Sequence, residues 1–307
     1  MILTVGMSPC VDVTVRLKKL TTGKTNVALD KAVTYAGKAN NVAVGISRLG
    51  EKSFVTGFMY NENGSLFEKA LNKEGVPFSF IWNPGRVREN YKFIDEDGRL
   101  TEVNEEGRAV TVERLRDLLG MVRSQSLKSD AVVISGGAPK GTPDTYYRDL
   151  VEAAKGSSFI AVDTYGTRLR AALEAGVDLV KPNLDELSAT FSREFTSIEE
   201  CASAARELVE LGAKRVLLSL GGEGAIIVDK NEAFLAKAPS VKVETTVGAG
   251  DAMVAAATTA ILRGASLDET LRCAVSAGTA CVVCKNDTSF TRKQYDKTYE
   301  KTSVSPL

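Results

Sequence analysis

The sequence predicts an α/β fold, a mostly parallel sheet covered by helices on both faces, with a small antiparallel β lid inserted into it. Three observations lead to this prediction. From residue 131 onward, short β-rich runs alternate with stretches of helical periodicity, which is typical of parallel strands joined by crossover helices. Earlier in the chain, two segments alternate in period two without an intervening helix. Near residue 250, a glycine-rich turn leads directly into an amphipathic helix.

The elements of the main sheet follow one another in a regular order. Each expected strand is a short apolar run, and each expected helix between two strands repeats its apolar residues every three or four positions. The expected strands are 131–135, 158–163, 177–183 and 216–220, followed by a hairpin over 225–236. The expected helices are 144–154, 167–175 and 197–212, and two closing helices begin after Gly248 and Ser266.

The expected lid consists of residues 11–17 together with a pair of strands over 88–95 and 99–103, joined by a turn at Gly98. We expect it to cover the crevice at the carboxyl ends of the parallel strands, where such folds bind ligands. The predicted lid spans 10–35 and 85–105, and the α/β body spans 1–9, 36–84 and 106–307. Because the edges of a small sheet favour pairing, the lid is also expected to join two copies into a homodimer.

Composition limits the chemistry that the chain can perform. The 307 residues contain 39 basic and 39 acidic side chains, so no overall charge favours nucleic acid or an anionic membrane. The chain has no histidine, which excludes Ser-His-Asp triads and leaves acid-base work to carboxylates, lysine, tyrosine or cysteine. Five cysteines, no apolar run of membrane-spanning length and no leader-like start predict a cytoplasmic protein without a disulfide framework.

The most specific chemical signal is the segment from Thr246 to Met253, which contains Gly248-Ala249-Gly250-Asp251. Small residues let the backbone approach a ligand closely, and the free N–H groups at a helix start form an anion site. Asp251 at that position could accept the proton of a hydroxyl that attacks a phosphoryl group. The alternative is that Gly250 makes a tight turn and Asp251 only caps the helix.

Several motifs in the same order resemble the PfkB (ribokinase-like) carbohydrate kinase family, in particular its 1-phosphofructokinase and tagatose-6-phosphate kinase branch. The resemblance covers essentially the whole chain. It implies a ribokinase-like fold, an ATP-dependent sugar kinase, and Mg²⁺ as the cofactor. The motifs are Ser8-Pro9-Cys10-Val11-Asp12, Gly37-Lys38-Ala39-Asn40-Asn41-Val42-Ala43, Arg88 to Lys92, Thr101 to Glu105, Lys181-Pro182-Asn183 with Glu186, Ser219 to Gly224, and Gly248 to Asp251.

The resemblance also implies a sugar site between lid and body. Its predicted residues are Asp12, Gly37, Lys38, Asn41, Arg88, Asn90 and Lys92. Residues 88, 90 and 92 share one face of a strand, and three cations around a small site favour an already phosphorylated sugar. For each charged residue, the alternative is an ordinary solvated side chain.

For the nucleotide, the resemblance implies contacts from Lys181, Asn183, Ser219, Gly221, Gly222, Gly224 and Ser276. Asn183 and Glu186 would hold Mg²⁺ through water, as suits a cation that keeps its hydration. The same spacing fits an N-cap followed by a glutamate in the first turn of the helix.

Ala36 and Ala39 stand where the family's sugar loop usually has glycines. The identity of the acceptor sugar is therefore left open. Fructose 1-phosphate is the first expectation, ahead of tagatose 6-phosphate and fructose 6-phosphate. A kinase of an unphosphorylated sugar or nucleoside, and a nucleotide-binding protein without catalysis, are the alternatives.

Overall fold

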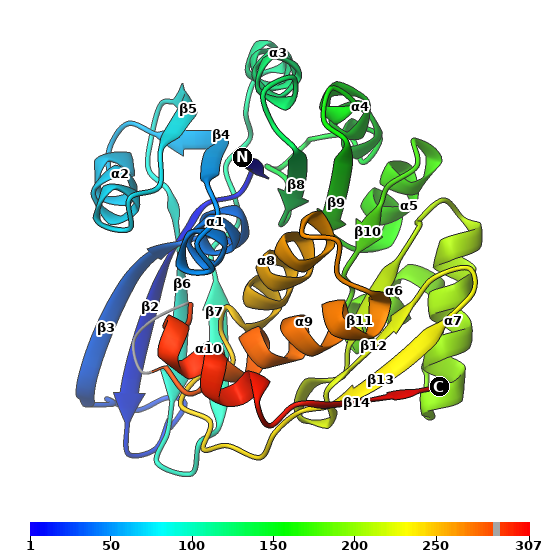
Figure 1. Ribbon diagram of the computed structural model, residues 1–307. Helices are drawn as coiled ribbons and strands as arrows, with labels where there is room; N and C mark the ends of the chain where they lie inside the picture. Colours follow the sequence, from blue (N-terminus) through cyan, green and yellow to red (C-terminus); the bar gives the residue numbers. More distant parts are fainter. Residues whose placement is uncertain (285–288) are drawn as a thin grey trace.

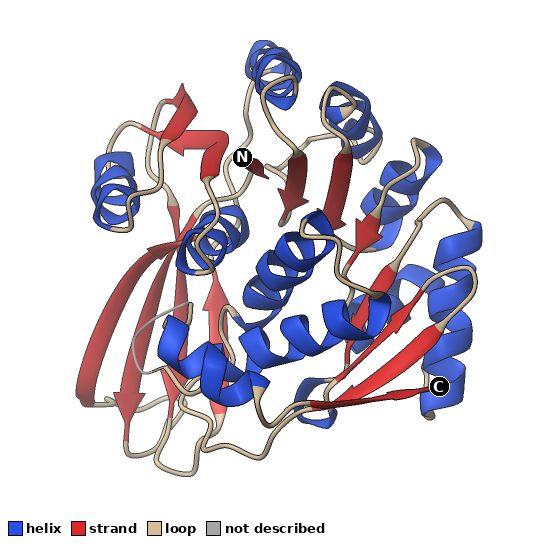
Figure 2. Ribbon diagram, viewed as in Figure 1, coloured by secondary structure: helices blue, strands red, loops and turns tan. Residues whose placement is uncertain are grey.

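The computed structural model describes residues 1–284 and 289–307. A large sheet runs through the middle with helices on both of its faces, and a second, smaller sheet stands beside one end of it (Figure 1). Figure 2 shows that strands and helices alternate through most of the chain, as the sequence predicts. The expected α/β architecture, a mostly parallel sheet with helices on both faces and a small second sheet, is thus the fold of this chain.

Within residues 1–284 and 289–307, the large sheet has seven parallel strands followed by an antiparallel extension at one edge. The hairpin expected over 225–236 forms the first part of this extension, and the last strand of the chain completes it. In spatial order the strands are β5 (Phe78–Asn83), β4 (Ser53–Tyr60), β1 (Ile2–Gly6), β8 (Ala131–Ser135), β9 (Phe159–Asp163), β10 (Leu179–Val180), β11 (Val216–Ser219), β12 (Ala225–Val228), β13 (Ala233–Lys237) and β14 (Ser303–Pro306).

Helices from the middle of the chain cover one face of this sheet, and the first and last helices cover the other. The first group is α3 (Val112–Ser126), α4 (Tyr146–Ala154), α5 (Gly166–Glu174), α6 (Leu184–Phe191) and α7 (Ile198–Glu210). The second group is α1 (Lys38–Arg48), α8 (Ala249–Leu262) and α9 (Leu267–Val282), while α10 (Arg292–Tyr299) packs on α9 and α2 (Gly64–Lys73) lies beside the small sheet.

The sequence analysis expected two closing helices, and the structure adds α10 and β14 after them. Only Tyr295 and Thr298 of α10 are buried, so the helix has almost no apolar stripe from which it could be predicted. Its start is fixed instead by a capping box between Thr291 and Gln294.

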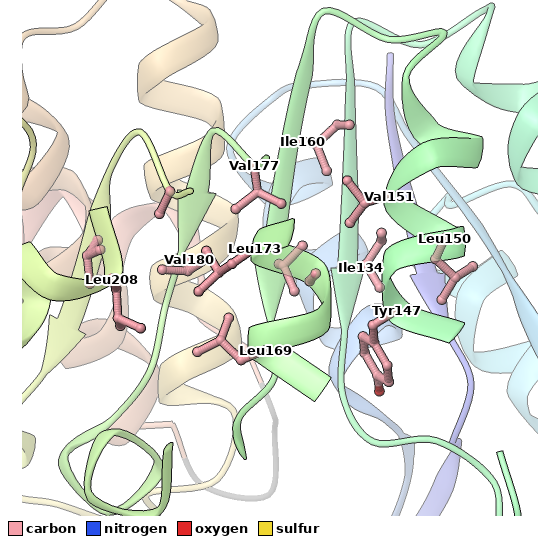
Figure 3. Packing of buried hydrophobic residues seen from close by; sticks show 14 of the residues in the cluster. Ile134, Tyr147, Leu150, Val151, Ile160, Leu169, Leu173, Val177, Val180 and Leu208 are labelled. Carbon is pink, nitrogen blue, oxygen red and sulfur yellow. The ribbon is translucent and has the colours of Figure 1, made fainter. Parts of the chain in front are cut away.

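The largest part of the apolar core lies in two layers, one on each face of the large sheet. Figure 3 shows the first layer, where Leu150 and Tyr147 of α4 and Leu169 of α5 pack against sheet residues such as Ile134. The second layer joins Val42 and Ile46 of α1 to residues of α8 and α9. Each fully buried large side chain contributes about 1.5–3 kcal/mol of transfer free energy, so both layers fix the body on which the site is built.

The small sheet has four strands in the order β3 (Ala28–Ala36), β2 (Cys10–Leu17), β6 (Arg88–Ile94) and β7 (Leu100–Asn104). The β2–β3 and β6–β7 pairs are antiparallel, as expected for two hairpins. The central pair, β2 with β6, is parallel. This arrangement follows because the chain returns through the body between the two hairpins before β6 begins, which is the connection that parallel neighbours require.

The carboxyl ends of the parallel strands share one edge of the large sheet. Strand β1 lies between β4 and β8: the chain runs from β1 to β4 and β5 on one side, and later returns through α3 to β8 on the other side. Such a reversal opens a crevice beyond the carboxyl ends of the strands, and the small sheet stands over that edge (Figure 1).

Among residues 1–284 and 289–307, none of the helices combines the length and the apolar character needed to cross a bilayer.

Candidate active site

A cleft of about 1030 Å³ lies at the carboxyl edge of the large sheet, between that sheet and the small one. Of the residues predicted from the sequence, Ser276 and Glu186 do not line it. Those that do are Asp12, Gly37, Lys38, Asn41, Arg88, Asn90, Lys92, Lys181, Asn183, Ser219, Gly221, Gly222, Gly224, Gly248, Ala249, Gly250 and Asp251. Residues far apart in the sequence therefore meet around one space.

Asp251 lies in the first turn of α8, whose N-cap is Gly248. Gly248 has φ +82°, a left-handed conformation that glycine adopts without a steric penalty. The first N–H groups of a helix have no intrahelical acceptor. The N–H group of Ala249 donates to the carbonyl oxygen of Thr246 over 3.4 Å, which leaves those of Gly250 and Asp251 as donors at the cleft. The side chain of Asn41 donates its Nδ2–H to Asp251 Oδ2 over 2.7 Å, which fixes the direction of the carboxylate.

Burial raises the pKa of Asp251 to about 6, and neighbouring Asp163 acts in the same direction. Lys38, the Asn41 hydrogen bond and Lys181 lower the pKa and so limit the shift. At neutral pH the carboxylate is ionised, yet its pKa is closer to neutrality than that of an ordinary aspartate. A carboxylate with this pKa is suited to accept a proton from a reacting hydroxyl.

Asp163 is a buried carboxylate that pairs with two cleft-lining lysines, and the sequence analysis did not single it out. It ends β9, is fully buried, and has Lys38 Nζ 3.0 Å from its Oδ2 and Lys181 Nζ 3.4 Å from its Oδ1. Ser135 Oγ donates a further hydrogen bond of 3.0 Å. Burial alone would raise its pKa, but the two lysines outweigh burial and lower it to about 2. Its place at the carboxyl end of a parallel strand was the available signal.

The strand β6 places Arg88, Asn90 and Lys92 on one face, toward the cleft. The Nζ atom of Lys92 lies 2.9 Å from Asp12 Oδ2, and both side chains are almost completely buried. Lys92 and Lys38 are thus already neutralised by carboxylates.

Arg88 differs from these two lysines. Its partners among the described residues are all neutral: Ser8 Oγ at 3.2 Å, Asn90 Oδ1 at 2.9 Å and the carbonyl oxygen of Glu105 at 3.2 Å. Of the three cations expected to face the substrate, Arg88 therefore keeps an uncompensated charge in the cleft.

Asn183 and Glu186 form a capping box at the start of α6. Asn183 Oδ1 accepts from the amide of Glu186 over 2.7 Å, and Glu186 Oε2 accepts from the amide of Asn183 over 2.9 Å. The other oxygen of Glu186, Oε1, lies 3.5 Å from Lys38 Nζ. The N-cap alternative thus describes the pair of Asn183 and Glu186. The carboxylate of Glu186 also faces Lys38, which pairs with Asp163.

Comparison with protein families matches residues 4–294 to the pfkB family carbohydrate kinases. The chain belongs to this family. The kinase is 35% identical over 280 residues to the 1-phosphofructokinase of Rhodobacter capsulatus, with 90% of this chain and 88% of that protein covered. It is 30% identical over 305 residues to the 1-phosphofructokinase of Escherichia coli K12, with 99% and 98% covered.

Among solved structures, the kinase resembles phosphofructokinase-2 from Escherichia coli in complex with substrates and products. The TM-score is 0.89 at 31% identity, and 98% of each chain is covered. The expectation of a sugar kinase, an enzyme that transfers a phosphoryl group, is therefore confirmed.

Ser276 of the kinase does not reach the cleft. Its hydroxyl donates to the carbonyl of Arg272 over 2.7 Å and contacts Thr302 Oγ1 at 2.9 Å, inside the packing of α9. Other residues of α9 line the cleft instead, and their spacing of three or four positions puts them on one face of the helix. These residues are Val275, Gly278, Thr279 and Val282.

In the segment predicted to be the sugar loop, Gly37 has φ +125° and is the N-cap of α1. Ala39 is buried, and its methyl group lies where a Cβ atom at Gly6 would clash with it at 2.7 Å. The methyl group of Ala39 thus occupies space that a glycine in β1 leaves open.

Proposed function

We propose that this kinase is an ATP-dependent 1-phosphofructokinase, which converts fructose 1-phosphate to fructose 1,6-bisphosphate. The observation that carries the proposal is one cleft lined both by Asp251 at the start of α8 and by the uncompensated Arg88 on the small sheet. A ketohexose phosphate has a matching polarity, with a phosphate at one end and a primary hydroxyl at the other. The names of the curated relatives select fructose 1-phosphate from this class.

In the proposed mechanism Asp251 accepts the proton of the acceptor hydroxyl as the hydroxyl attacks the γ-phosphoryl group of ATP. Asn41 keeps the receiving oxygen in place through its 2.7 Å hydrogen bond. The N–H groups of residues 248 to 251 stabilise the charge that develops on the transferred group. The adenosine part of ATP would extend toward Ser219 to Gly224 and the cleft face of α9.

The residues present fit a hydrated Mg²⁺ better than a closed protein cage. No group of three or more Asp, Glu or Cys side chains that could hold a metal occurs within the described part of the chain. Asn183 lines the cleft, and Glu186 lies directly behind it beside Lys38, so both could hold the ion through water, as proposed. Bound there, Mg²⁺ would neutralise charge on the phosphates of ATP.

A second candidate substrate is fructose 6-phosphate. It is supported by the similarity to the phosphofructokinase-2 of Escherichia coli solved in complex with fructose-6-phosphate, at a TM-score of 0.87 and 30% identity. Tagatose 6-phosphate presents the same two ends and is the third.

ADP release from MgATP, measured with fructose 1-phosphate, fructose 6-phosphate, tagatose 6-phosphate and fructose, tests the proposal. The highest kcat/KM is expected with fructose 1-phosphate. A clear preference for another sugar phosphate would replace the named substrate, and turnover of fructose alone would contradict the phosphate site.

Replacement of Arg88 by alanine is expected to raise KM for the sugar phosphate by about 10- to 100-fold, because a charged hydrogen bond is worth about 1.5–3 kcal/mol. KM for ATP should change little. Steady-state kinetics with each substrate varied in turn provides the measurement. An equal rise in both KM values would indicate general damage to the cleft rather than loss of a phosphate contact.

We also propose that the small sheet closes over the substrate and joins two copies into a homodimer. Five of the twelve exposed large apolar side chains among the described residues lie on this sheet or its loops: Val27, Leu29, Val33, Leu100 and Val103. Both edge strands, β3 and β7, keep one side unpaired within the part of the single chain that the structure describes. A related protein, phosphofructokinase-2 from Escherichia coli, has been solved in a tetrameric inhibited form.

Sedimentation velocity tests the homodimer. The wild type is expected to sediment with twice the mass of the chain, and a Leu29→Lys, Val103→Lys double variant as a monomer. A wild type that stays monomeric at micromolar concentration would contradict the proposal.

The proposed site of action is the cytoplasm. All five cysteines lie among the described residues, and the structure contains no disulfide between them, as suits a reducing compartment. Localisation of a tagged chain in the cells that make it would test this, and export would contradict it.

A further inference from the structure

The cleft-facing side of the small sheet presents its polar side chains in rows that cross the strands. Asp12 of β2 pairs in register with Asn90 of β6, and Asn90 pairs with Asn104 of β7. Because side chains alternate along each strand, the next row on the same face passes through Lys92 and ends at Glu102. Glu102 and Asn104 both line the cleft, so β7 contributes to the site although no role was assigned to it above.

Most polar groups in these rows are already occupied by one another. Asp12 accepts from Lys92 at 2.9 Å, from Asn90 at 3.3 Å and from the thiol of Cys10 at 3.7 Å. A carboxylate offers about four acceptor positions, so little of the capacity of Asp12 remains for a sugar. The sequence analysis had placed Asp12 among the residues of the sugar site.

Glu102 and Asn104 are different. Both are exposed to the cleft, and neither side chain has a hydrogen bond or ion pair among the described residues. Lys92, the cross-strand neighbour of Glu102, is held by Asp12 instead. The carboxylate of Glu102 therefore keeps its full capacity to accept hydrogen bonds from a ligand.

We propose that Glu102, together with the amide of Asn104, binds the ring hydroxyls of the sugar phosphate and determines which configuration the kinase accepts. The proposal rests on the proposed function. Like charges repel, so the phosphate cannot lie against Glu102 and is left to Arg88. The hydroxyl groups of the ring then face Glu102, where adjacent hydroxyls can donate to its two oxygens. In an epimer at a carbon that carries one of these hydroxyls, the hydroxyl points away from Glu102 and leaves an oxygen of that carboxylate unpaired.

The test compares fructose 1-phosphate with its epimers at C4 and C3, tagatose 1-phosphate and psicose 1-phosphate. For wild type and Glu102→Gln, kcat/KM is measured by ADP release, and Kd for each sugar phosphate is measured by calorimetry without ATP. In the variant, kcat/KM and affinity for the preferred sugar are expected to fall on the order of 10-fold. The values for the rejected epimers should change much less, so the preference itself shrinks.

A matched control is Thr101→Ala, since Thr101 neighbours Glu102 on the opposite face of β7. It should leave the epimer preference unchanged, whereas Glu102→Asp should retain part of it. An unchanged preference in Glu102→Gln, with an active wild type, would overturn the role of Glu102 and leave the proposed function intact. A wild type that neither binds nor turns over any of these sugars would overturn both the role of Glu102 and the proposed function. If the wild type binds the sugar phosphates without turning them over, comparison of the Kd values of wild type and Glu102→Gln still decides the role of Glu102.

Discussion

Replacement of Asp251 by asparagine is expected to lower kcat by about 10²- to 10⁴-fold, the range that a general base contributes. KM for ATP should stay within a small factor, because asparagine can still accept the hydrogen bond that Asn41 donates to Asp251 Oδ2. The N–H groups at the start of α8 remain in place as well. Single-turnover kinetics at saturating substrate measures the chemical step directly.

The same variant should be more stable than the wild type at neutral pH. The pKa of Asp251 is raised from 3.8 to about 6 in the folded state, so the protonated form favours folding. The stabilisation of the folded state by protonated Asp251 is fully present below about pH 4 and is lost as the pH rises through about 6. Its loss lowers the free energy of unfolding by an amount on the order of 3 kcal/mol. The uncharged asparagine side chain carries no such cost. Urea unfolding between pH 4 and pH 8 should show the two proteins diverging as the pH rises.

The wild-type kcat/KM should fall as the pH drops below about 6, because protonation of Asp251 removes the base. Retention of most activity in the asparagine variant would contradict the assignment of the base. A stability difference that does not depend on pH would contradict the raised pKa and leave the assignment of the base standing.

Replacement of Asp163 by asparagine is expected to destabilise the protein by about 3–5 kcal/mol, because it leaves Lys38 and buried Lys181 without the carboxylate they share. Activity should fall too, since Lys38 and Lys181 both line the cleft. The pKa of Asp163 is lowered to about 2 in the folded state, so its contribution is present above about pH 4 and is lost as the pH falls toward about 2. Chemical unfolding at about pH 7 measures the loss of stability in the variant. The same measurement at about pH 3 shows how much of the stabilisation by Asp163 has been lost in the wild type.

Ser135→Ala is the matched control, as it removes only a neutral hydrogen-bond donor to the same carboxylate, at 3.0 Å. That change should cost about 1 kcal/mol. Equal losses for the two variants would show that the ion pairs of Asp163 add nothing beyond its hydrogen bond with Ser135.

Local patterns were enough to predict most of the fold. The strand over 131–135 and the helix after Gly248 are each encoded by a few neighbouring residues, through the alternation of apolar and polar positions or a glycine that permits φ above zero. The parallel pairing of β2 with β6 was not predictable in this way, because it depends on how the intervening body brings two hairpins together. Helix α10 was not predicted because it buries only two of its side chains, Tyr295 and Thr298.

The sequence by itself determined the fold class, the family and the position of Asp251 at a helix start, since each depends on short local patterns and on their order along the chain. Only the tertiary structure decided which charges remain available. Lys92 meets Asp12 and Lys38 meets Asp163 across 80 and 125 residues of sequence, so their neutralisation could not be inferred from spacing. Arg88 and Glu102 keep their charges in the cleft because folding gives them no opposite charge among the described residues, and charge pairing is a property of distance in space.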